Sequence, residues 1–250
     1  MILGRSLGGS HDATLTALPG VDTTSDCYNF VNNSWFCPAY FVDRSDEIVS
    51  ALQEHVLLTV VSVLLGTLLA FPLAVLARRS DLAAAVVLGI STIIYTIPSL
   101  AMFSLLLVVF YVFNLSGITR TNVVIGLALY SLTILVRNML AGLNAVPSEV
   151  RDAGRGLGYG ATRMLFRIEL PLALPVIFAG LRVATVSTVA LVTVGSILGY
   201  GGLGNLIREG YNTNFKAELF TGSVLCVLLA VAFDLLLLGV QRVSTPWQRR

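Results

Sequence analysis

The chain has 250 residues, of which 56% are hydrophobic and 12% are charged. A soluble domain carries roughly twice that charged fraction, which argues against a soluble globular enzyme. Since one transmembrane helix takes ~20 apolar residues, the composition leaves room for five or six spans. The net charge of +2 does not indicate a nucleic-acid partner. Three cysteines and two histidines do not indicate a zinc site of the usual kind, and no metal or cofactor is expected.

Long uncharged runs follow a polar, mostly acidic first segment. They cover residues 56–77, 82–119, 121–136 with its continuation after Arg137 to 148, 170–181 and 183–207; the last run, 219–240, contains one charge, Asp234. The 82–119 run is too long for one straight span, since it would reach ~57 Å across a ~30 Å hydrocarbon core. It is slightly short for two full spans and a turn.

Arginine positions predict the topology. Ten arginines lie in or beside three short segments: Arg78 and Arg79; Arg137, Arg151, Arg155, Arg163 and Arg167; Arg242, Arg249 and Arg250. The positive-inside rule places all three segments in the cytoplasm, which requires an even number of crossings between the first two. We therefore count 82–119 as one crossing, interrupted near Pro98, with its excess length as a broken or re-entrant piece.

Five crossings result, with the N-terminus outside and the C-terminus in the cytoplasm. Residues 1–47 become an extracytoplasmic tail, 48–243 a transmembrane domain and 244–250 a cytoplasmic tail. No basic segment followed by an apolar one opens the chain, so a cleaved signal peptide is not expected.

The polar loop 147–171 predicts two short helices joined by a glycine. Ser148 is expected to cap the first helix, which runs to about Leu157, and Gly158 then takes the left-handed conformation. A second amphipathic helix places its apolar residues on one side and its arginines on the other, and Pro171 marks the start of the next span. The apolar side holds Met164, Leu165 and Ile168, opposite Arg163 and Arg167.

Enzyme signatures are weak throughout the chain. A P-loop, Gly-x-Ser-x-Gly and His-Glu-x-x-His are missing from the sequence. Ser196 after Gly195 leaves open an intramembrane hydrolase, but such a nucleophile needs a nearby base. His55 is expected to be an interfacial cap at the outer edge of the first span. The glycine-rich stretch 199–204 predicts a tight, non-helical turn after the fourth span.

A spaced pattern at the end of the loop resembles a family motif. Asp152-Ala153-Gly154, three residues, Gly158, nine residues, Ile168, one residue and Leu170-Pro171 resemble the EAA motif of ABC-importer permeases. That motif reads Glu-Ala-Ala, Gly, Ile and Leu-Pro at the same spacing. Here Asp152 replaces the glutamate and Gly154 replaces the second alanine, which preserves an acid and a small residue.

Two further stretches resemble the quaternary-amine, or osmoprotectant, permeases. These are Tyr-Thr-Ile-Pro-Ser-Leu-Ala at 95–101 and Gly-Tyr-Gly-Gly-Leu-Gly at 199–204, followed by Asp234 in the last span. Methionine-importer permeases share much of this layout. The resemblance covers about residues 48–243 and leaves out the first 45 residues.

The resemblance implies an all-α membrane protein with the type I ABC importer permease fold. It implies about five transmembrane helices, a cytoplasmic coupling helix and a bacterial inner-membrane location. The implied partners are two ABC ATPase subunits, a second permease copy or a paralogue, and an extracytoplasmic substrate-binding protein. The implied cargo is glycine betaine, choline, carnitine or a relative. A permease for methionine or another amino acid is the alternative, and a membrane scaffold without ATP-coupled activity is a further one.

The resemblance also assigns roles to residues. ATPase coupling falls to the motif positions Asp152, Ala153, Gly154, Gly158, Ile168, Leu170 and Pro171, with the small residues allowing close approach and Asp152 anchoring the glycine turn. A cation-conducting pathway favours aromatic and uncharged groups. The pathway candidates are Tyr95, Thr96, Pro98, Ser99, Phe103 and Tyr130, and packing is the alternative for each aromatic residue.

Two charges and two cysteines complete the candidates. Arg182 and Asp234 lie deepest in apolar runs, and we expect them either to pair or to extend separately to the cytoplasmic edge. A structural role is favoured for both. Cys27 and Cys37 lie in the tail placed outside, where an oxidising environment favours a disulfide between them.

Overall fold

The computed structural model describes residues 33–114 and 120–249, and all regular elements in these ranges are helices. The first elements are α1 (Pro38–Asp43), α2 (Ser45–Ala77), α3 (Asp81–Thr96), α4 (Ser99–Val112) and α5 (Arg120–Asn144). The next are α6 (Ser148–Gly156), α7 (Ala161–Met164), the π-helix η2 (Leu165–Glu169) and α8 (Leu170–Val194). The last are the 3₁₀-helix η3 (Gly195–Leu198), α9 (Leu203–Asn212), α10 (Lys216–Ser244) and the 3₁₀-helix η4 (Pro246–Arg249).

Helix length and hydropathy identify the spans. Four helical segments of the described chain are long and apolar enough to cross a membrane: Ser45–Ala77, Arg120–Asn144, Ala161–Leu198 and Lys216–Ser244. The α3–α4 pair passes the same test jointly, with a bend of 102°. Counted as one broken span, this pair brings the total for the described ranges to five, the predicted number.

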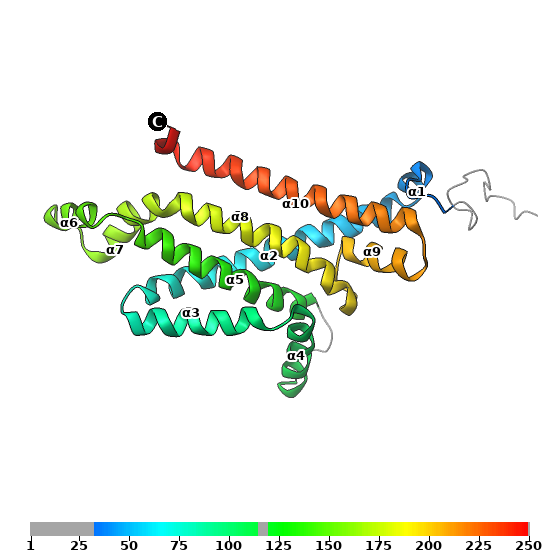
Figure 1. Cartoon of the computed structure of the whole chain (residues 1–250), viewed down its shortest axis with the longest axis horizontal. Helices are drawn as coiled ribbons and strands as arrows, with labels where there is room; N and C mark the ends of the chain where they lie inside the picture. Colours follow the sequence, from blue (N-terminus) through cyan, green and yellow to red (C-terminus); the bar gives the residue numbers. More distant parts are fainter. Residues whose placement is uncertain (1–32, 115–119, 250) are drawn as a thin grey trace, which may run out of the picture.

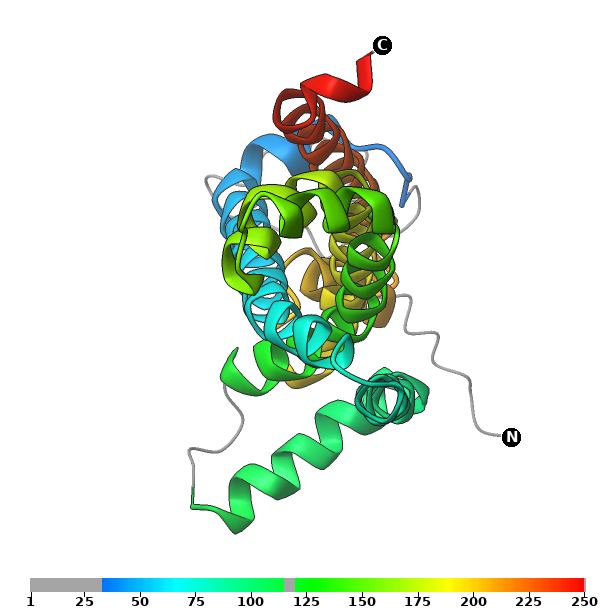
Figure 2. The same cartoon turned by 90° about the vertical axis from the view of Figure 1, so that its left-hand side faces the viewer.

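The bend lies where the sequence predicts an interruption. Ile97 has extended backbone angles, as the residue before a proline prefers, and Pro98 begins a new helical direction. α3 runs along the bundle, whereas α4 stands away from it, as Figure 2 shows most clearly. The run therefore forms one helix along the bundle, α3, and a second helix, α4, that points out of it.

The core of the bundle is formed where α5 packs between α2 and α8. In the most apolar window of α5, 67% of residues are buried, against 33% in α2 and none in α10. Glycine lets the helices approach closely, because a Cβ on Gly66 of α2 would lie 2.1 Å from Ser131 Oγ of α5. The exposed apolar surface of α10 is suited to lipid.

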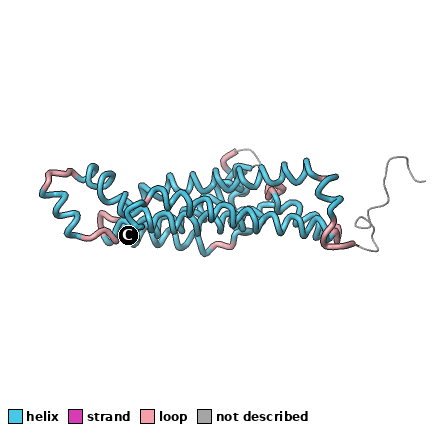
Figure 3. The backbone as a smooth tube through the Cα atoms, turned by 90° about the horizontal axis from the view of Figure 1, so that it is seen from above, coloured by secondary structure: helices cyan, strands magenta, loops and turns pink. Residues whose placement is uncertain are grey.

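The bundle has two distinct ends, which we name by their short helices. Figure 1 places α6 and α7 beyond one end of the long helices and α9 and α1 at the other. Most connections also lie at these ends, as Figure 3 shows. We call them the α6 end and the α9 end.

Candidate coupling loop and membrane pathway

The glycine turn after α6 forms as predicted. Gly158 has φ +79°, and its N–H donates to the Arg155 carbonyl at 2.9 Å. The N–H of Tyr159 donates to the Gly154 carbonyl at 3.1 Å. These two bonds define a Schellman motif, which satisfies the carbonyls at the end of α6. The turn fixes the direction in which the chain leaves α6.

The start of α6 differs from the prediction. Pro147 occupies the N-cap position, Ser148 is the first helical residue, and its side chain forms no capping bond. Pro147 has ψ 144°, which lies outside the helical region, so the helix begins directly after it. Glu149 lies in the first turn, where its negative charge interacts favourably with the helix dipole.

Gly154 is a packing residue within this chain. A Cβ at Gly154 would lie 2.6 Å from Met164 Cε and 3.0 Å from Ile168 Cδ1. The glycine therefore lets α6 lie against α7 and η2. By contrast, a Cβ on Gly156 or Gly158 would meet nothing within 4 Å. These two glycines, Gly160 and exposed Ala153 leave open space for a partner.

Asp152 does not anchor the glycine turn, contrary to expectation. Its carboxylate accepts a hydrogen bond from Arg155 Nη1 at 3.0 Å, and 67% of its side chain is exposed. The Schellman bonds already satisfy the turn, so no backbone group there needs this carboxylate. Asp152 and Arg155 instead form an exposed charged pair on α6.

The second predicted helix is continuous with the following span. α7, η2 and α8 join into one helical segment, Ala161–Leu198, and Pro171 lies in its interior near the start of α8. Pro171 lacks the N–H of a regular helix, and the wider π turn of η2 lies directly before it. The predicted amphipathic pattern is confirmed: Met164 is buried, Leu165, Ile168 and Leu170 are half-buried, and Arg163 and Arg167 are exposed.

An ion pair that the sequence analysis missed ties the loop to α2. Arg78 Nη1 and Nη2 donate to the two Glu169 carboxylate oxygens at 2.8 and 2.9 Å. Only 16% and 8% of the two side chains are exposed. This paired geometry is the strong form of a salt bridge. Glu169 occupies the variable position between Ile168 and Leu170 of the motif, so the motif itself gives no signal for it.

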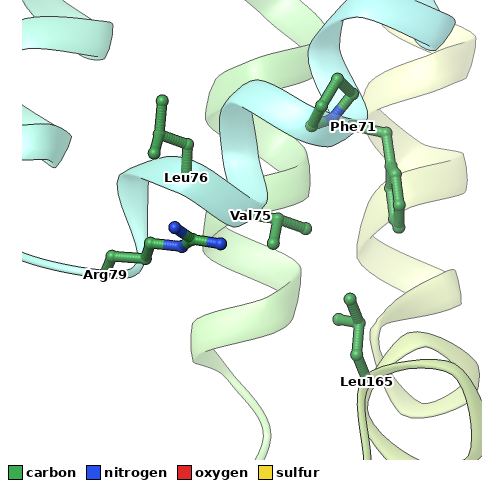
Figure 4. A pocket seen from close by; sticks show the side chains of 6 residues that line it. Phe71, Val75, Leu76, Arg79 and Leu165 are labelled. Carbon is green, nitrogen blue, oxygen red and sulfur yellow. The ribbon is translucent and has the colours of Figure 1, made fainter. Parts of the chain in front are cut away.

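A shallow apolar groove lies between α2 and η2 at the same end. Phe71 and Val75 of α2 and Leu165 of η2 point into it, and Arg79 lies at its edge (Figure 4). The Phe71 and Phe166 rings contact each other with centroids 6.1 Å apart. The loop therefore rests on α2 through an ion pair and an apolar contact.

The pathway candidates divide into two groups around the α3–α4 break. Tyr95, Thr96 and Pro98 are exposed, and Ser99 is half-buried. The Tyr95 ring contacts Tyr130 edge to face, with centroids 6.0 Å apart. The buried Tyr130 hydroxyl donates to the Ile97 carbonyl, which the break leaves without a helical partner. Tyr130 therefore stabilises the α3–α4 break through this hydrogen bond and the ring contact with Tyr95.

Phe103 packs inside the chain. Only 2% of it is exposed, and it lies in an apolar cluster with Leu58, Leu127 and Val192. A Cβ on Gly126 would lie 2.7 Å from its ring, which shows how closely α4 approaches α5 at this point. Phe103 therefore anchors the first turns of α4 against the bundle. Its burial agrees with a packing role and not with a place in the cargo pathway.

The two deep charges form a pair. Arg182 of α8 donates from Nε and Nη2 to the two Asp234 oxygens of α10, at 2.8 and 2.7 Å. The pairing alternative is thus the observed geometry. The ion pair joins two spans at membrane depth and leaves neither charge exposed to lipid without a partner.

His55 packs against the glycine-rich turn at 199–204 and is not the interfacial cap that the sequence predicts. His55 is fully buried, with Nε2 3.0 Å from the Val189 carbonyl, and a Cβ on Gly202 would lie 2.7 Å from His55 Cβ. Ser196 is buried as well. Within the described ranges no hydrogen bond joins Ser196 to His55, and no three potential metal ligands cluster. His55 is therefore a packing residue.

The first described residues pack on the α9 end. Tyr40 of α1 is buried against Phe215, with ring centroids 5.4 Å apart, beside Leu203 and Leu206 of α9. Cys37 is disulfide-bonded and 1% exposed. Cys27 lies outside the described residues, so its pairing with Cys37 stays a prediction.

Comparisons with known proteins agree with this geometry. Residues 62–250 match the family described as "Binding-protein-dependent transport system inner membrane component". The chain is 36% identical to the osmoprotectant import permease protein OsmW of Salmonella typhimurium over 83% of this chain and 96% of that protein. It is 32% identical to the choline transport system permease protein OpuBB of Bacillus subtilis over 80% of this chain and 89% of that protein.

Solved structures show the same fold. A chain of the methionine ABC transporter MetNI in an inward facing conformation superposes with a TM-score of 0.74 at 21% identity, covering 81% of this chain and 98% of that one. A chain of an amino acid ABC transporter gives 0.66 at 20% identity, covering 82% and 97%. At these identities the likeness establishes the arrangement of the helices alone.

Proposed function

The chain belongs to the family of inner-membrane components of binding-protein-dependent transport systems, and we propose that it is the permease subunit of an ABC importer for osmoprotectants. Glycine betaine, choline and carnitine are the cargo candidates, since relatives at 30–36% identity are named for osmoprotectant, choline, carnitine and glycine betaine transport. ATP hydrolysis belongs to a separate ATPase chain, and this subunit conducts the cargo.

The coupling loop is the observation that carries the proposal. α6 projects beyond the long helices, and the Schellman turn at Gly158 sets its direction. We assign α6 and the turn to the contact with the ATPase. Movement of the ATPase would act on α6, pass through Gly154 to α7 and η2, and reach α2 through the Arg78–Glu169 pair. A bundle with two packings that the ATPase can bias is what coupling requires.

The assembly follows from the same reasoning. We propose two permease subunits, two ATPase subunits and an extracytoplasmic binding protein, with the second permease either this chain or a paralogue. The exposed residues Tyr95 and Thr96 at the end of α3, with Pro98 at the break, would face the cargo route between the permeases, since broken helices at membrane depth are tolerated where they line a cavity.

Orientation is part of the proposal. The α6 end would lie in the cytoplasm and the α9 end outside, with residues 1–47 outside and 244–250 inside. Arg151, Arg155, Arg163 and Arg167 lie at the α6 end and support this orientation. Reporter fusions at Arg155 and Asn212 test it: an external signal from the Arg155 fusion would invert the assignment.

The decisive experiment is transport by the purified complex. The permease, its ATPase and its binding protein are reconstituted in liposomes, and ATP-dependent uptake of glycine betaine, choline, carnitine, methionine and proline is measured. We expect uptake of at least one quaternary amine and none of methionine. Uptake of methionine alone would favour the amino-acid alternative.

A further inference from the structure

Arg137 is a positive charge inside a span with only a neutral partner among the described residues. By the positive-inside rule Arg137 counts with the cytoplasmic loop, but it lies within α5, seven residues before the helix ends at Asn144. Its side chain is exposed, and Nη2 donates to Thr92 Oγ1 of α3 at 2.5 Å. No carboxylate in the described chain lies within ion-pair distance of it.

The Arg137 guanidinium points along the bundle towards the α9 end, away from the near end of α5. α3 and α5 run antiparallel side by side, and Thr133 Oγ1 donates to the Ser91 carbonyl at 3.0 Å. This register places the backbone of Arg137, one turn further along α5, level with about residue 87 of α3. Its bond to Thr92 therefore reaches more than one turn towards the α9 end. An arginine that extends to the near membrane surface would point the opposite way.

Two acids inside span helices on the α6 side of the bundle are already engaged. Glu169 pairs with Arg78 and Asp234 pairs with Arg182, each through both oxygens. A second copy of this chain would bring the same engaged acids. A membrane-embedded charge needs a counter-charge, and a carboxylate on a passing ligand can supply it.

An aromatic face lies one turn away on the same side of α3. Tyr95 is three residues after Thr92, 52% exposed, and its ring is held edge to face by Tyr130. Positions three apart on a helix are neighbours, about 5–6 Å between Cβ atoms. A tyrosine ring attracts a quaternary ammonium group through its face. Arg137 and Tyr95 thus present an anion site and a cation site side by side.

We propose that Arg137, Thr92 and Tyr95 form a cargo subsite for zwitterions that carry a quaternary ammonium and a carboxylate. The guanidinium binds the carboxylate, and the Tyr95 ring binds the ammonium. Glycine betaine and carnitine have both groups, separated by a short carbon chain. Choline lacks the carboxylate, so its positive charge is repelled by Arg137 and no attraction to the guanidinium offsets this repulsion. This inference rests on the proposed function and specifies its cargo class.

The test compares Arg137→Gln with wild type in the reconstituted complex, using the same binding protein to deliver glycine betaine and choline. We expect the maximal uptake rate of glycine betaine to fall about tenfold, as the loss of a charged hydrogen bond predicts. Choline uptake should stay the same or rise. Arg120→Gln is the matched control on the same helix, because Arg120 is exposed and lies at the opposite end of α5, where it pairs with Glu54. It should change neither rate.

Each other outcome has a definite meaning. Equal loss of both cargoes in Arg137→Gln, or no loss of either, overturns the subsite. A wild-type complex that carries choline but no carboxylate-bearing amine also overturns it and leaves the proposed function standing. A wild-type complex that carries no quaternary amine contradicts the proposed function itself.

A labelling experiment keeps the inference testable if Arg137→Gln inserts poorly. Arg137→Cys is treated with a charged, membrane-impermeant thiol reagent, and the labelled peptide is identified by mass spectrometry. We expect labelling that slows severalfold in the presence of glycine betaine and not of choline. A thiol at 137 that never reacts faces lipid or protein, and that result excludes a cargo subsite there.

Discussion

The two ends of the bundle are held together by different kinds of contact. At the α9 end, glycines bring backbone against backbone: a Cβ on Gly201 would lie 2.4 Å from Ser196 N, and one on Gly204 would lie 2.5 Å from Thr193 Cα. At the α6 end, side chains make the contacts, through Met164 against Gly154 and Arg78 against Glu169.

This difference assigns different mechanical roles to the two ends. Backbone contacts without free space have one arrangement, because no side-chain rotation can replace them. Side-chain contacts and ion pairs can exchange partners when a bound protein moves. The α6 end is therefore suited to transmit motion from an ATPase, and the α9 end is suited to keep α2, α8 and α9 in a fixed relation.

The largest expected difference in stability is between two variants that each add one methyl group, one variant at each end. Gly201→Ala places a Cβ against the Ser196 backbone, which cannot move aside, and should lower the free energy of unfolding by about 3 kcal/mol. Gly156→Ala at the α6 end meets nothing and lies in a helix, so it should be neutral or slightly stabilising. Thermal unfolding of the isolated permease in detergent measures both. Equal stability of the two variants would contradict the comparison.

The next effect concerns the ion pair that joins the loop to α2. Glu169→Gln leaves Arg78 largely buried without a counter-charge, which should cost about 3 kcal/mol. The variant should also hydrolyse ATP with reduced uptake, since the loop loses its tie to α2. The reversed pair Arg78→Glu with Glu169→Arg is the control and should recover part of both losses. If Glu169→Gln keeps full stability and full uptake per ATP, the pair does not connect loop and bundle.

The glycine turn should give a smaller effect. Gly158→Val forces a branched side chain into φ +79° and should cost about 1–2 kcal/mol, with uptake reduced while the permease still inserts. Gly158→Asn is the matched control, because asparagine tolerates the left-handed conformation better. Co-purification with the ATPase and uptake are the measurements. Full transport by the valine variant would show that the turn is not required for coupling.

These sites differ in how far the sequence alone predicts them. Gly158 and the break at Pro98 were predictable, because a left-handed turn and a missing N–H each restrict the residue type at one position. The Arg182–Asp234 pair was one of two stated alternatives, since charges in apolar runs need partners. Local chemistry was sufficient in these cases.

Other features depend on residues far apart in the chain. Glu169 is 91 positions from Arg78, and His55 is 134 from its carbonyl partner, so neither contact leaves a local pattern. Pro171 lies in the first turn of α8, as predicted, but the π turn before it joins α8 to α7 in one helical segment, which the proline alone does not indicate. The bond from Arg137 to Thr92 is not predictable either, because composition gives the charge of a segment and not the direction of a side chain.

The smallest effect on stability is expected at Asp152, and it isolates the partner contact. Asp152 and Arg155 are 67% and 73% exposed, and an exposed pair of this kind contributes at most about 0.5 kcal/mol. Asp152→Ala should therefore unfold at nearly the wild-type temperature. Any loss of uptake then reports on the contact with the ATPase, because the turn beside it is satisfied by backbone bonds without this carboxylate. Asp152→Glu, which introduces the acid of the family motif, is the control and should retain uptake.

We expect a severalfold weaker association of Asp152→Ala with the ATPase, measured by titrating the purified ATPase against the permease in nanodiscs. Unchanged association would limit the contact to Ala153 and the open glycines of α6. Loss of stability without loss of association would instead show that the Asp152–Arg155 pair supports the fold of α6 and that the two ends are more alike than their contacts indicate.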